Sequence, residues 1–156
     1  MAPKYDRDEL VARLVRAGEL EVSGEHPDEV PDYFAPGFEF HGPGEFESDY
    51  EGLQDYFASL RAGFDDRSIR RGIIVVEGNT IACQTWIEGR FVREFTQSPV
   101  GSLPPNGRRV IWDLSSIFTF DDEGRITAEW VRTDNQSVLQ QLQAPPARAA
   151  AGPSHA

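Results

Sequence analysis

Hydrophobic residues recur at helical spacing in the first part of the chain. Over residues 8–17 they form one face of an amphipathic helix, with arginines between them. Residues 27–34 begin with a proline and predict a shorter helical segment, which the Pro36-Gly37 pair ends. A brief alternation over residues 38–41 indicates a short edge strand. The next helix is predicted over residues 51–64, where large apolar residues again share one face.

After Asp66 the apolar residues alternate with polar ones, which predicts strands. The predicted strands cover residues 73–77, 80–95, 109–120 and 126–134, with turn-forming residues between them. Gly89 lies inside the long second strand and indicates a bulge or bend. A last short helix is predicted over residues 135–143. Helices followed by an antiparallel meander indicate the α+β class: a cone-shaped barrel in which a strongly curved antiparallel sheet wraps around the N-terminal helices.

Such a cone is open at its wide end, and the inward side chains of its strands line it. One face of strand 109–120 carries Trp112, Leu114, Ser116 and Phe118. One face of strand 126–134 carries Ile126, Ala128, Trp130, Arg132 and Asp134. We expect these tryptophan-bearing faces to point inward, so that Asp134 lies at the mouth of an apolar cavity. The outer face then carries Ile111, Ile117, Val131 and Thr133.

The length and composition of the chain indicate one domain. It has 156 residues, of which 39% are hydrophobic, enough to bury a continuous core. We expect this domain to cover residues 1–143. Residues 144–156 are rich in proline, alanine and glycine and predict a disordered tail.

The net charge narrows the choice of partners. Against 15 basic residues stand 26 acidic ones, a formal net charge of -11. This charge repels nucleic-acid phosphates and anionic membranes, so neither is an expected partner. No apolar run approaches the roughly 20 residues of a membrane helix, and the start of the chain does not resemble a signal peptide. We therefore expect a cytoplasmic protein.

The rare residues exclude several kinds of chemistry. Cys83 is the one cysteine, so neither an internal disulfide nor a cysteine-rich zinc site can form. Lys4 is the one lysine and lies near a terminus, which argues against Schiff-base catalysis. Glycine-rich nucleotide motifs do not occur, and the acidic run over residues 45–51 is typical of a solvated face rather than of a metal site. We expect no cofactor and no metal, so carboxylates, hydroxyls, arginines and histidines must carry any reaction.

Several short motifs occur in an order that resembles the SnoaL-like polyketide cyclases. Gly124-Arg125-Ile126, followed by Trp130 and Asp134 and then by Leu139 and Gln141-Leu142, is similar to the closing signature of that family. Upstream, Pro105-Asn106-Gly107-Arg108 resembles the family's proline-threonine-glycine turn. His41-Gly42-Pro43 resembles its histidine-x-proline motif, and Tyr50-Glu51-Gly52-Leu53 resembles the start of its glycine-led helix. The resemblance spans residues 10–143. It implies the cone fold that this family shares with nuclear transport factors, ketosteroid isomerases and limonene epoxide hydrolases.

The resemblance also implies a catalytic residue. In the cyclases the aspartate after the tryptophan acts as general acid/base in an intramolecular aldol closure, and by position it corresponds to Asp134. The chain departs from the family at Gly89-Arg90-Phe91, where a glycine-threonine-histidine string is common, at Gln84, where arginine is common, and at Gln143, where the family ends on glycine. The aspartate of ketosteroid isomerases corresponds to Gly42.

Each candidate residue has a functional and a structural explanation. Asp134 is a catalytic acid/base or the N-cap of the last helix. His41 is a second catalytic candidate, as a hydrogen-bond donor or acid/base, or a polar residue of the rim. Ser116 offers a hydroxyl to a substrate or satisfies a neighbouring backbone group. The remaining candidate substrate-binding residues either form an aromatic wall around the substrate or belong to the core. They are Trp86, Trp112, Phe118 and Trp130.

We therefore predict a cofactor-independent pocket enzyme of secondary metabolism, as in antibiotic biosynthesis. It acts on an apolar, polyketide-like or polycyclic small molecule by carboxylate acid/base catalysis, in an aldol-type cyclisation or an isomerisation. One alternative is activation of water by Asp134 in the same cone, as in a hydrolase or hydroxylase. Another is a module that binds a ligand or dimerises without turnover. We also expect a homodimer through the outer face of the sheet.

Overall fold

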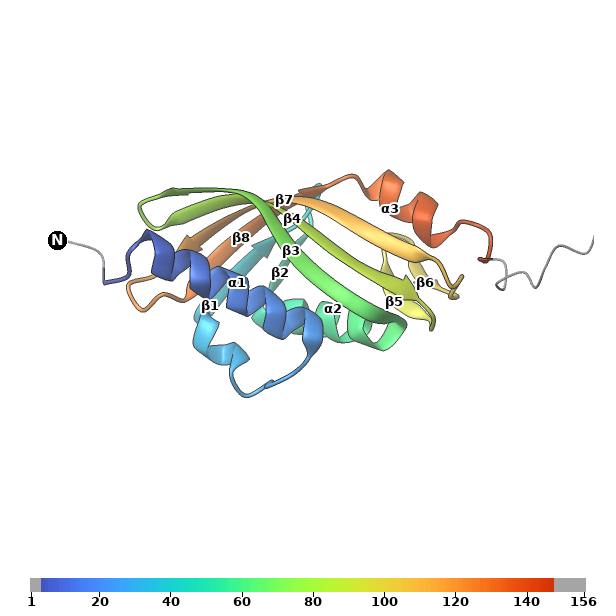
Figure 1. Ribbon diagram of the computed structural model, residues 1–156, viewed down its shortest axis with the longest axis horizontal. Coiled ribbons are helices and arrows are strands. Elements are labelled where there is room, and N and C mark those ends of the chain that lie inside the picture. Colours follow the sequence, from blue (N-terminus) through green and yellow to red (C-terminus); the bar gives the residue numbers. More distant parts are fainter. Residues whose placement is uncertain (1–3, 148–156) are drawn as a thin grey trace, which may run out of the picture.

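The first helix, α1 (Arg7–Ser23), crosses one face of the sheet in the computed structural model, which describes residues 4–147 (Figure 1). Asp6 caps its N-terminus, because the Asp6 carboxylate accepts a hydrogen bond from a backbone N–H of the first turn. Gly24 ends the helix in the left-handed region at φ 74°, which glycine adopts without steric cost. α1 is longer than the predicted helix over residues 8–17, because its buried face continues through Leu20.

Short elements connect α1 to the second long helix. The 3-10 helix η1 (Val30–Tyr33) leads into β1 (Phe34–His41), which turns back into β2 (Glu47–Asp49). The helix α2 (Tyr50–Gly63) follows, and Asp49 caps it by accepting a hydrogen bond from a backbone N–H at 2.9 Å. The predicted helix over residues 51–64 is thereby confirmed within one residue.

The segment before α2 differs from the prediction. The helical part of residues 27–34 is a single 3-10 turn, and the strand predicted over residues 38–41 begins at Phe34. Pro36 and Gly37 lie inside β1 rather than at a helix end. They fall where the pairing of β1 with β8 (Ile126–Thr133) is irregular, so the missing N–H of Pro36 interrupts no regular ladder.

Six strands form a strongly curved sheet in the order β2-β1-β8-β7-β4-β3. Its other long strands are β3 (Phe64–Glu77), β4 (Thr80–Phe91) and β7 (Arg109–Phe120). All neighbours pair antiparallel except β1 and β8, which are parallel. α1 and α2 lie on one face, here called the concave face, and α3 (Asn135–Leu142) continues from β8 (Figure 1). The predicted α+β cone is confirmed, although the sheet does not close into a barrel.

Two strand boundaries differ from the predicted ones. β3 begins at Phe64 rather than Ile73, because its polar first half lies at the sheet edge, where alternate side chains reach solvent. β4 ends at Phe91, and the strand predicted to continue to residue 95 leaves the sheet there. A separate hairpin of β5 (Phe95–Ser98) and β6 (Gly101–Leu103) follows.

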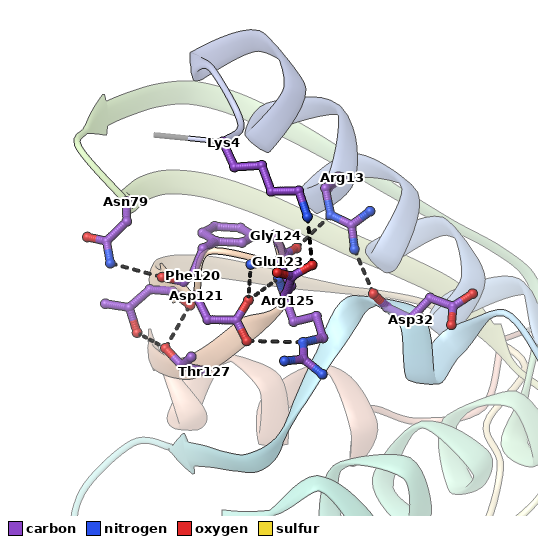
Figure 2. Close-up of polar contacts among 11 residues, drawn as sticks. Lys4, Arg13, Asp32, Asn79, Phe120, Asp121, Glu123, Gly124, Arg125 and Thr127 are labelled. Carbon is purple, nitrogen blue, oxygen red and sulfur yellow. Dashed lines mark hydrogen bonds and ion pairs between the residues drawn. The ribbon is translucent and has the colours of Figure 1, made fainter. Parts of the chain in front are cut away.

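The turn between β7 and β8 is fixed by side-chain hydrogen bonds (Figure 2). The Asp121 carboxylate accepts hydrogen bonds from the backbone N–H of Glu123 at 2.9 Å and of Arg125 at 3.0 Å. The Arg125 guanidinium donates to the same carboxylate at 3.0 Å. Arg13 of α1 donates to the carbonyl oxygen of Gly124 at 2.6 Å and ties the turn to the helix. This turn therefore starts β8 in a defined register.

A bulge follows within the first residues of β8. Phe120 pairs with Ile126 and Thr119 pairs with Ala128, so Thr127 has no partner of its own in β7. The Thr127 hydroxyl donates to the Thr119 carbonyl oxygen at 3.1 Å and compensates in part for the lost pairing (Figure 2). The extra residue reverses which side chains of β8 point inward from Ala128 onward.

The reversal corrects the predicted faces of the last strand. Beyond the bulge, Glu129, Val131 and Thr133 pair across the concave face with Phe118, Ser116 and Leu114 of β7. Trp130 pairs with Ile117, on the opposite, convex face. The prediction that Trp130 faces the interior is wrong, as is the prediction that Val131 and Thr133 lie outside.

Two apolar clusters form the core. The first packs the N-terminal half of α1 against the β7–β8 turn and contains Leu10, Leu14, Phe34, Ile81, Phe118, Phe120 and Ile126 among others. The second lies between α2, β5 and α3 and contains Leu60, Phe64, Phe91, Phe95, Trp112, Val138 and Leu142 among others. Residues of both clusters line the cavity that is described below.

The end of the described chain lies beside the turn before β7. The backbone N–H of Ala147 donates to the Asn106 carbonyl oxygen at 2.8 Å, and the Asn106 amide donates to the carbonyl oxygen of Ala144 at 3.2 Å. The remaining residues of the predicted disordered tail, 148–156, lie outside the described residues. Among residues 4–147, no helix is long and apolar enough to cross a membrane.

Candidate active site

A cavity of about 520 Å³ lies between the concave face of the sheet and helices α1 and α2. This volume is in the range of small-molecule pockets, about 300–1,000 Å³. Most of its lining is apolar, and the aromatic part consists of Phe34, Phe40, Phe46, Tyr56, Phe57, Trp112 and Phe118. An apolar ring system can therefore be buried there.

Two loops form part of the cavity lining. Pro43 and Phe46 come from the β1–β2 connection, and residues 97–99 come from the β5–β6 hairpin. The Phe46 side chain is 59% exposed, which is unusual for an aromatic residue beside an apolar cavity. Both loops thus lie in position to contact a ligand that fills the cavity.

Three charged side chains from different elements line the same cavity. They are Glu21 of α1, Arg71 of β3 and Glu129 of β8, here called the charged cluster. Charges in an apolar cavity interact strongly, because little water screens them. The charges of Arg71 and Glu21 act in opposite directions on the pKa of Glu129, so the cluster is electrostatically coupled.

Glu21 is the most buried member of the cluster. It is 3% exposed, although its helix is amphipathic and its neighbours on that face are apolar. The Gln54 amide of α2 donates to its Oε2 at 2.9 Å, whereas its Oε1 is buried without a hydrogen-bond partner. Burial raises the pKa of Glu21 to about 7, while the Gln54 hydrogen bond and the charge of Arg61 lower it.

Glu129 faces the cavity from the middle of the sheet. Phe118 pairs with it on one side and Phe40 on the other, so apolar rings flank the carboxyl group. Loss of hydration raises the pKa of Glu129 to about 7, with the charge of Arg71 lowering it and that of Glu21 raising it. A carboxyl group with this pKa can both accept and return a proton near neutral pH.

Arg71 crosses from β3 toward the same space. Its guanidinium donates to the Thr85 hydroxyl at 2.7 Å and lies 3.9 Å from Cys83 Sγ and 5.5 Å from the ring centroid of Phe118. A Cβ at position 18 of α1 would lie 2.7 Å from a guanidinium nitrogen, so Gly18 makes room for it. Most of the five N–H donors of Arg71 therefore have no protein acceptor within the described chain.

Three of the predicted substrate-binding residues line the cavity. Trp112, Ser116 and Phe118 lie on the concave face of β7, as the alternation predicted. Trp112 and Phe118 also belong to the two core clusters. Their role in substrate binding stays a prediction.

The other predicted aromatic residues and His41 lie on the convex face. The Arg70 guanidinium covers Trp86 at 4.0 Å from the ring centroid. His41 stacks on Trp130 at 5.2 Å between centroids, and its ring nitrogens lie 3.5 Å from Glu39 and 3.4 Å from Glu47. None of these residues lines the cavity.

Asp134 lies at the C-terminal end of β8 and is exposed. Its carboxylate accepts a hydrogen bond from the Ser137 backbone N–H at 3.1 Å and caps α3. It is not among the residues that line the cavity. The geometry matches the capping explanation, and the catalytic role of Asp134 stays a prediction.

Sequence and structural comparisons identify the family. The family model for SnoaL-like polyketide cyclases matches residues 12–142. The chain belongs to this family. No curated protein matches the chain.

Solved structures similar to this SnoaL-like chain share its fold. AclR, a proposed hydroxylase from Streptomyces galilaeus, is 17% identical with a TM-score of 0.74, over 90% of this chain and 100% of AclR. IdmH, a proposed polyketide cyclase from Streptomyces antibioticus, is 24% identical with a TM-score of 0.71, over 86% of this chain and 98% of IdmH. TsrD from Streptomyces laurentii is 24% identical with a TM-score of 0.70, over 90% of this chain and 98% of TsrD.

The sequence analysis did not identify the charged cluster. One signal was available, because Glu21 continues the apolar face of α1 that Leu14 and Ala17 begin, where a charge is unusual. Glu129 was hidden by the bulge at Thr127, which reverses the alternation just before it. Arg71 lies in the polar half of β3, which the alternation did not include in a strand.

Proposed function

We propose that this SnoaL-like protein is an enzyme that transfers protons on an apolar, ring-containing carbonyl compound of the polyketide type. The observation that supports this most directly is the carboxyl group of Glu129, partly buried between aromatic rings in a cavity of about 520 Å³. Membership of the SnoaL-like polyketide cyclase family supports this choice of substrate class. Cyclisation and isomerisation both begin with the same step, the removal of a proton from a carbon next to a carbonyl group.

In the proposed step the Glu129 carboxylate removes a proton from a carbon next to a carbonyl group. The electron pair of the broken C–H bond forms an enolate, and Glu129 becomes a neutral carboxylic acid. In a cyclisation the enolate carbon then bonds to a second carbonyl carbon of the same molecule, and the resulting alkoxide takes the proton back from Glu129. In an isomerisation the proton returns to a different carbon.

Arg71 is the second residue of the proposed mechanism. Its side chain lines the same cavity as Glu129, so its N–H groups can donate to the carbonyl oxygen on which negative charge develops. The Thr85 hydroxyl accepts a hydrogen bond from the guanidinium, and Gly18 leaves room for it, so the group is oriented before substrate binds. Such prearranged donors stabilise the enolate more than the ground-state ketone.

The choice between Glu129 and Asp134 as the acid/base can be tested with a simple probe. 2-Tetralone carries acidic C–H bonds between a carbonyl group and an aromatic ring, and their exchange in deuterated water is followed by proton NMR. We expect the protein to accelerate this exchange and Glu129→Gln to lower the acceleration by about a hundredfold or more. Asp134→Asn is the matched control, because asparagine caps a helix nearly as well as aspartate and we expect the rate to be retained.

The other outcomes identify the alternatives. Loss of exchange in Asp134→Asn with retention in Glu129→Gln would assign the acid/base to Asp134. No acceleration by the wild-type protein, combined with binding of 2-tetralone, would overturn the proton-transfer proposal in favour of a ligand-binding module.

We also propose that two copies associate through the convex face. A row of side chains crosses that face from β3 to β8: Val75, Ala82, Ile117 and Trp130, which are paired residues of adjacent strands. The Val75 and Ile117 side chains are 58% and 46% exposed. Association of like faces about a two-fold axis would remove this apolar row from water.

A further inference from the structure

The structure contains a buried acceptor atom that the proposed proton transfer does not use. Glu21 is 3% exposed, and its Oε1 is the one buried side-chain nitrogen or oxygen in the described chain without a hydrogen-bond partner. Leaving such an atom unsatisfied costs free energy, so an orphaned acceptor on a residue that lines a cavity points to a missing donor. The missing donor is to be sought in the ligand, because Glu21 lines the cavity.

The position of Glu21 is fixed by its neighbours. The Gln54 amide holds Oε2 at 2.9 Å, and the Arg61 guanidinium donates to the backbone oxygen of Glu21 at 2.5 Å. The carboxylate therefore cannot rotate to give Oε1 a protein donor without breaking the hydrogen bond between Gln54 and Oε2. A residue held in this way is suited to orienting a ligand.

The rest of the charged cluster places Glu21 relative to the reacting centre. Gly18 lies three residues before Glu21 on the same face of α1, and a Cβ at this position would meet the guanidinium of Arg71 at 2.7 Å. All three side chains line the same cavity, and the charges of Glu21 and Arg71 both act on Glu129. A ligand group that reaches Glu21 thus lies beside the two residues proposed for catalysis.

We propose that Glu21 is a specificity residue that accepts a hydrogen bond from a hydroxyl group of the substrate. The substrate class is then narrower than an apolar carbonyl compound: it is a ring system with a phenolic or enolic hydroxyl at the end that enters the cavity. This inference rests on the proposed function for the location of the site, but it concerns binding and not proton transfer. A substrate without the hydroxyl leaves Glu21 unsatisfied and is rejected.

Two naphthalenes of similar shape test the proposal. 2-Naphthol carries a hydroxyl donor, and 2-methoxynaphthalene carries an oxygen that can only accept. Their dissociation constants are measured by calorimetry at about pH 8, where the Glu21 carboxylate is ionised. We expect wild type to bind 2-naphthol about tenfold more tightly, as a hydrogen bond to a charged group predicts.

Substitutions of Glu21 test whether its carboxylate causes the preference for 2-naphthol. Glu21→Met removes the acceptor, and we expect the two ligands to bind equally. Glu21→Gln retains the shape and the acceptor for Gln54 but turns an amide N–H toward the cavity, so the preference disappears even if Glu21→Met folds poorly. Glu19→Met is the matched control, because it removes an exposed glutamate from the same helix and should retain the tenfold preference.

The outcomes separate this inference from the proposed function. Equal binding of both ligands by wild type, or an undiminished preference in Glu21→Gln, would overturn the role of Glu21 while the exchange of 2-tetralone continues. A preference that depends on Glu21, found in a protein that does not accelerate exchange, would support the inference and overturn proton transfer. If wild type binds neither naphthalene, the role of Glu21 is overturned, and the exchange of 2-tetralone decides the proposed function separately.

Discussion

The two faces of the sheet use the same residue types differently. Arg70 and Arg71 are adjacent in β3, yet Arg70 covers Trp86 on the convex face and Arg71 points into the cavity. Glu129 and Trp130 are adjacent in β8 and are divided in the same way. On the convex face a glutamate such as Glu88 is paired with an arginine at 2.9 Å and meets solvent.

The concave face keeps its charges without such pairing. Arg71 donates to a hydroxyl and a thiol, and Glu21 retains a buried oxygen without a partner. Buried charges without partners lower the stability of the fold, so we infer that this cavity keeps them for ligand binding or catalysis. The convex face, in contrast, combines paired charges with an exposed apolar row and is suited to association.

Association through the convex face gives the largest expected effect. Ile117→Asp places a carboxylate in the middle of the proposed interface, and the two-fold axis places it there twice. Burial of one unpaired charge costs about 3–5 kcal/mol, so even one of the two carboxylates should raise the dissociation constant by about two to four orders of magnitude. Sedimentation equilibrium measures it, and we expect a monomer at micromolar concentration.

The control for this prediction is Val100→Asp. Val100 lies in the β5–β6 turn and is 58% exposed, so the substitution changes a similar apolar side chain outside the sheet. It should leave the mass in solution unchanged. A wild-type protein of 17.4 kDa in solution would contradict the interface itself.

The adjacent arginines give a second test of the difference between the faces. Arg71→Met removes the proposed donor to the enolate, and we expect 2-tetralone exchange to fall by about ten- to a hundredfold. Arg70→Met removes the same charge from the convex face and should leave the rate close to wild type. Equal rates in the two variants would mean that Arg71 does not contact the reacting carbonyl group.

Much of the fold could be predicted from alternation alone. The strand over residues 109–120 was predicted with the bounds of β7, and its concave residues Trp112, Ser116 and Phe118 line the cavity. The sequence of β7 alternates without interruption, so its faces follow from the pleat. The same rule failed in β8, because one extra residue at Thr127 reverses the faces and nothing in the local sequence marks it.

The site was less predictable than the fold. Asp134 was prominent because of its position after Trp130, but β8 ends before it and its carboxylate caps α3. Glu21, Arg71 and Glu129 are far apart in the chain and line one cavity only because α1 packs on β3 and the curved sheet brings β8 to the same space. Such a cluster depends on tertiary geometry, which local patterns do not contain.

The pH dependence of stability gives the smallest of the expected effects and distinguishes the faces most directly. Burial raises the pKa of Glu129 from 4.5 to about 7 in the folded protein, whereas the unfolded chain retains the ordinary value. Between about pH 4.5 and pH 7 the folded state therefore binds more protons at this site than the unfolded state. The free energy of unfolding must fall as the pH rises through that interval, and it levels off above it.

Glu129→Gln removes this contribution, which is on the order of 1–3 kcal/mol. We expect the variant to match wild type near pH 5 and to exceed it in stability near pH 8, as measured by urea denaturation at each pH. Glu88→Gln on the convex face should instead be less stable than wild type by a similar amount at both pH values, because the Arg109 hydrogen bond lowers the pKa of Glu88 from 4.5 and the stabilisation by its ionised form is lost only below about pH 4.5. If the stability of Glu129→Gln relative to wild type were the same at both pH values, Glu129 would be hydrated in the cavity and would titrate like a surface glutamate. The contrast between buried charges on the concave face and solvated charges on the convex face would then not hold for Glu129, the residue on which the proposed chemistry depends.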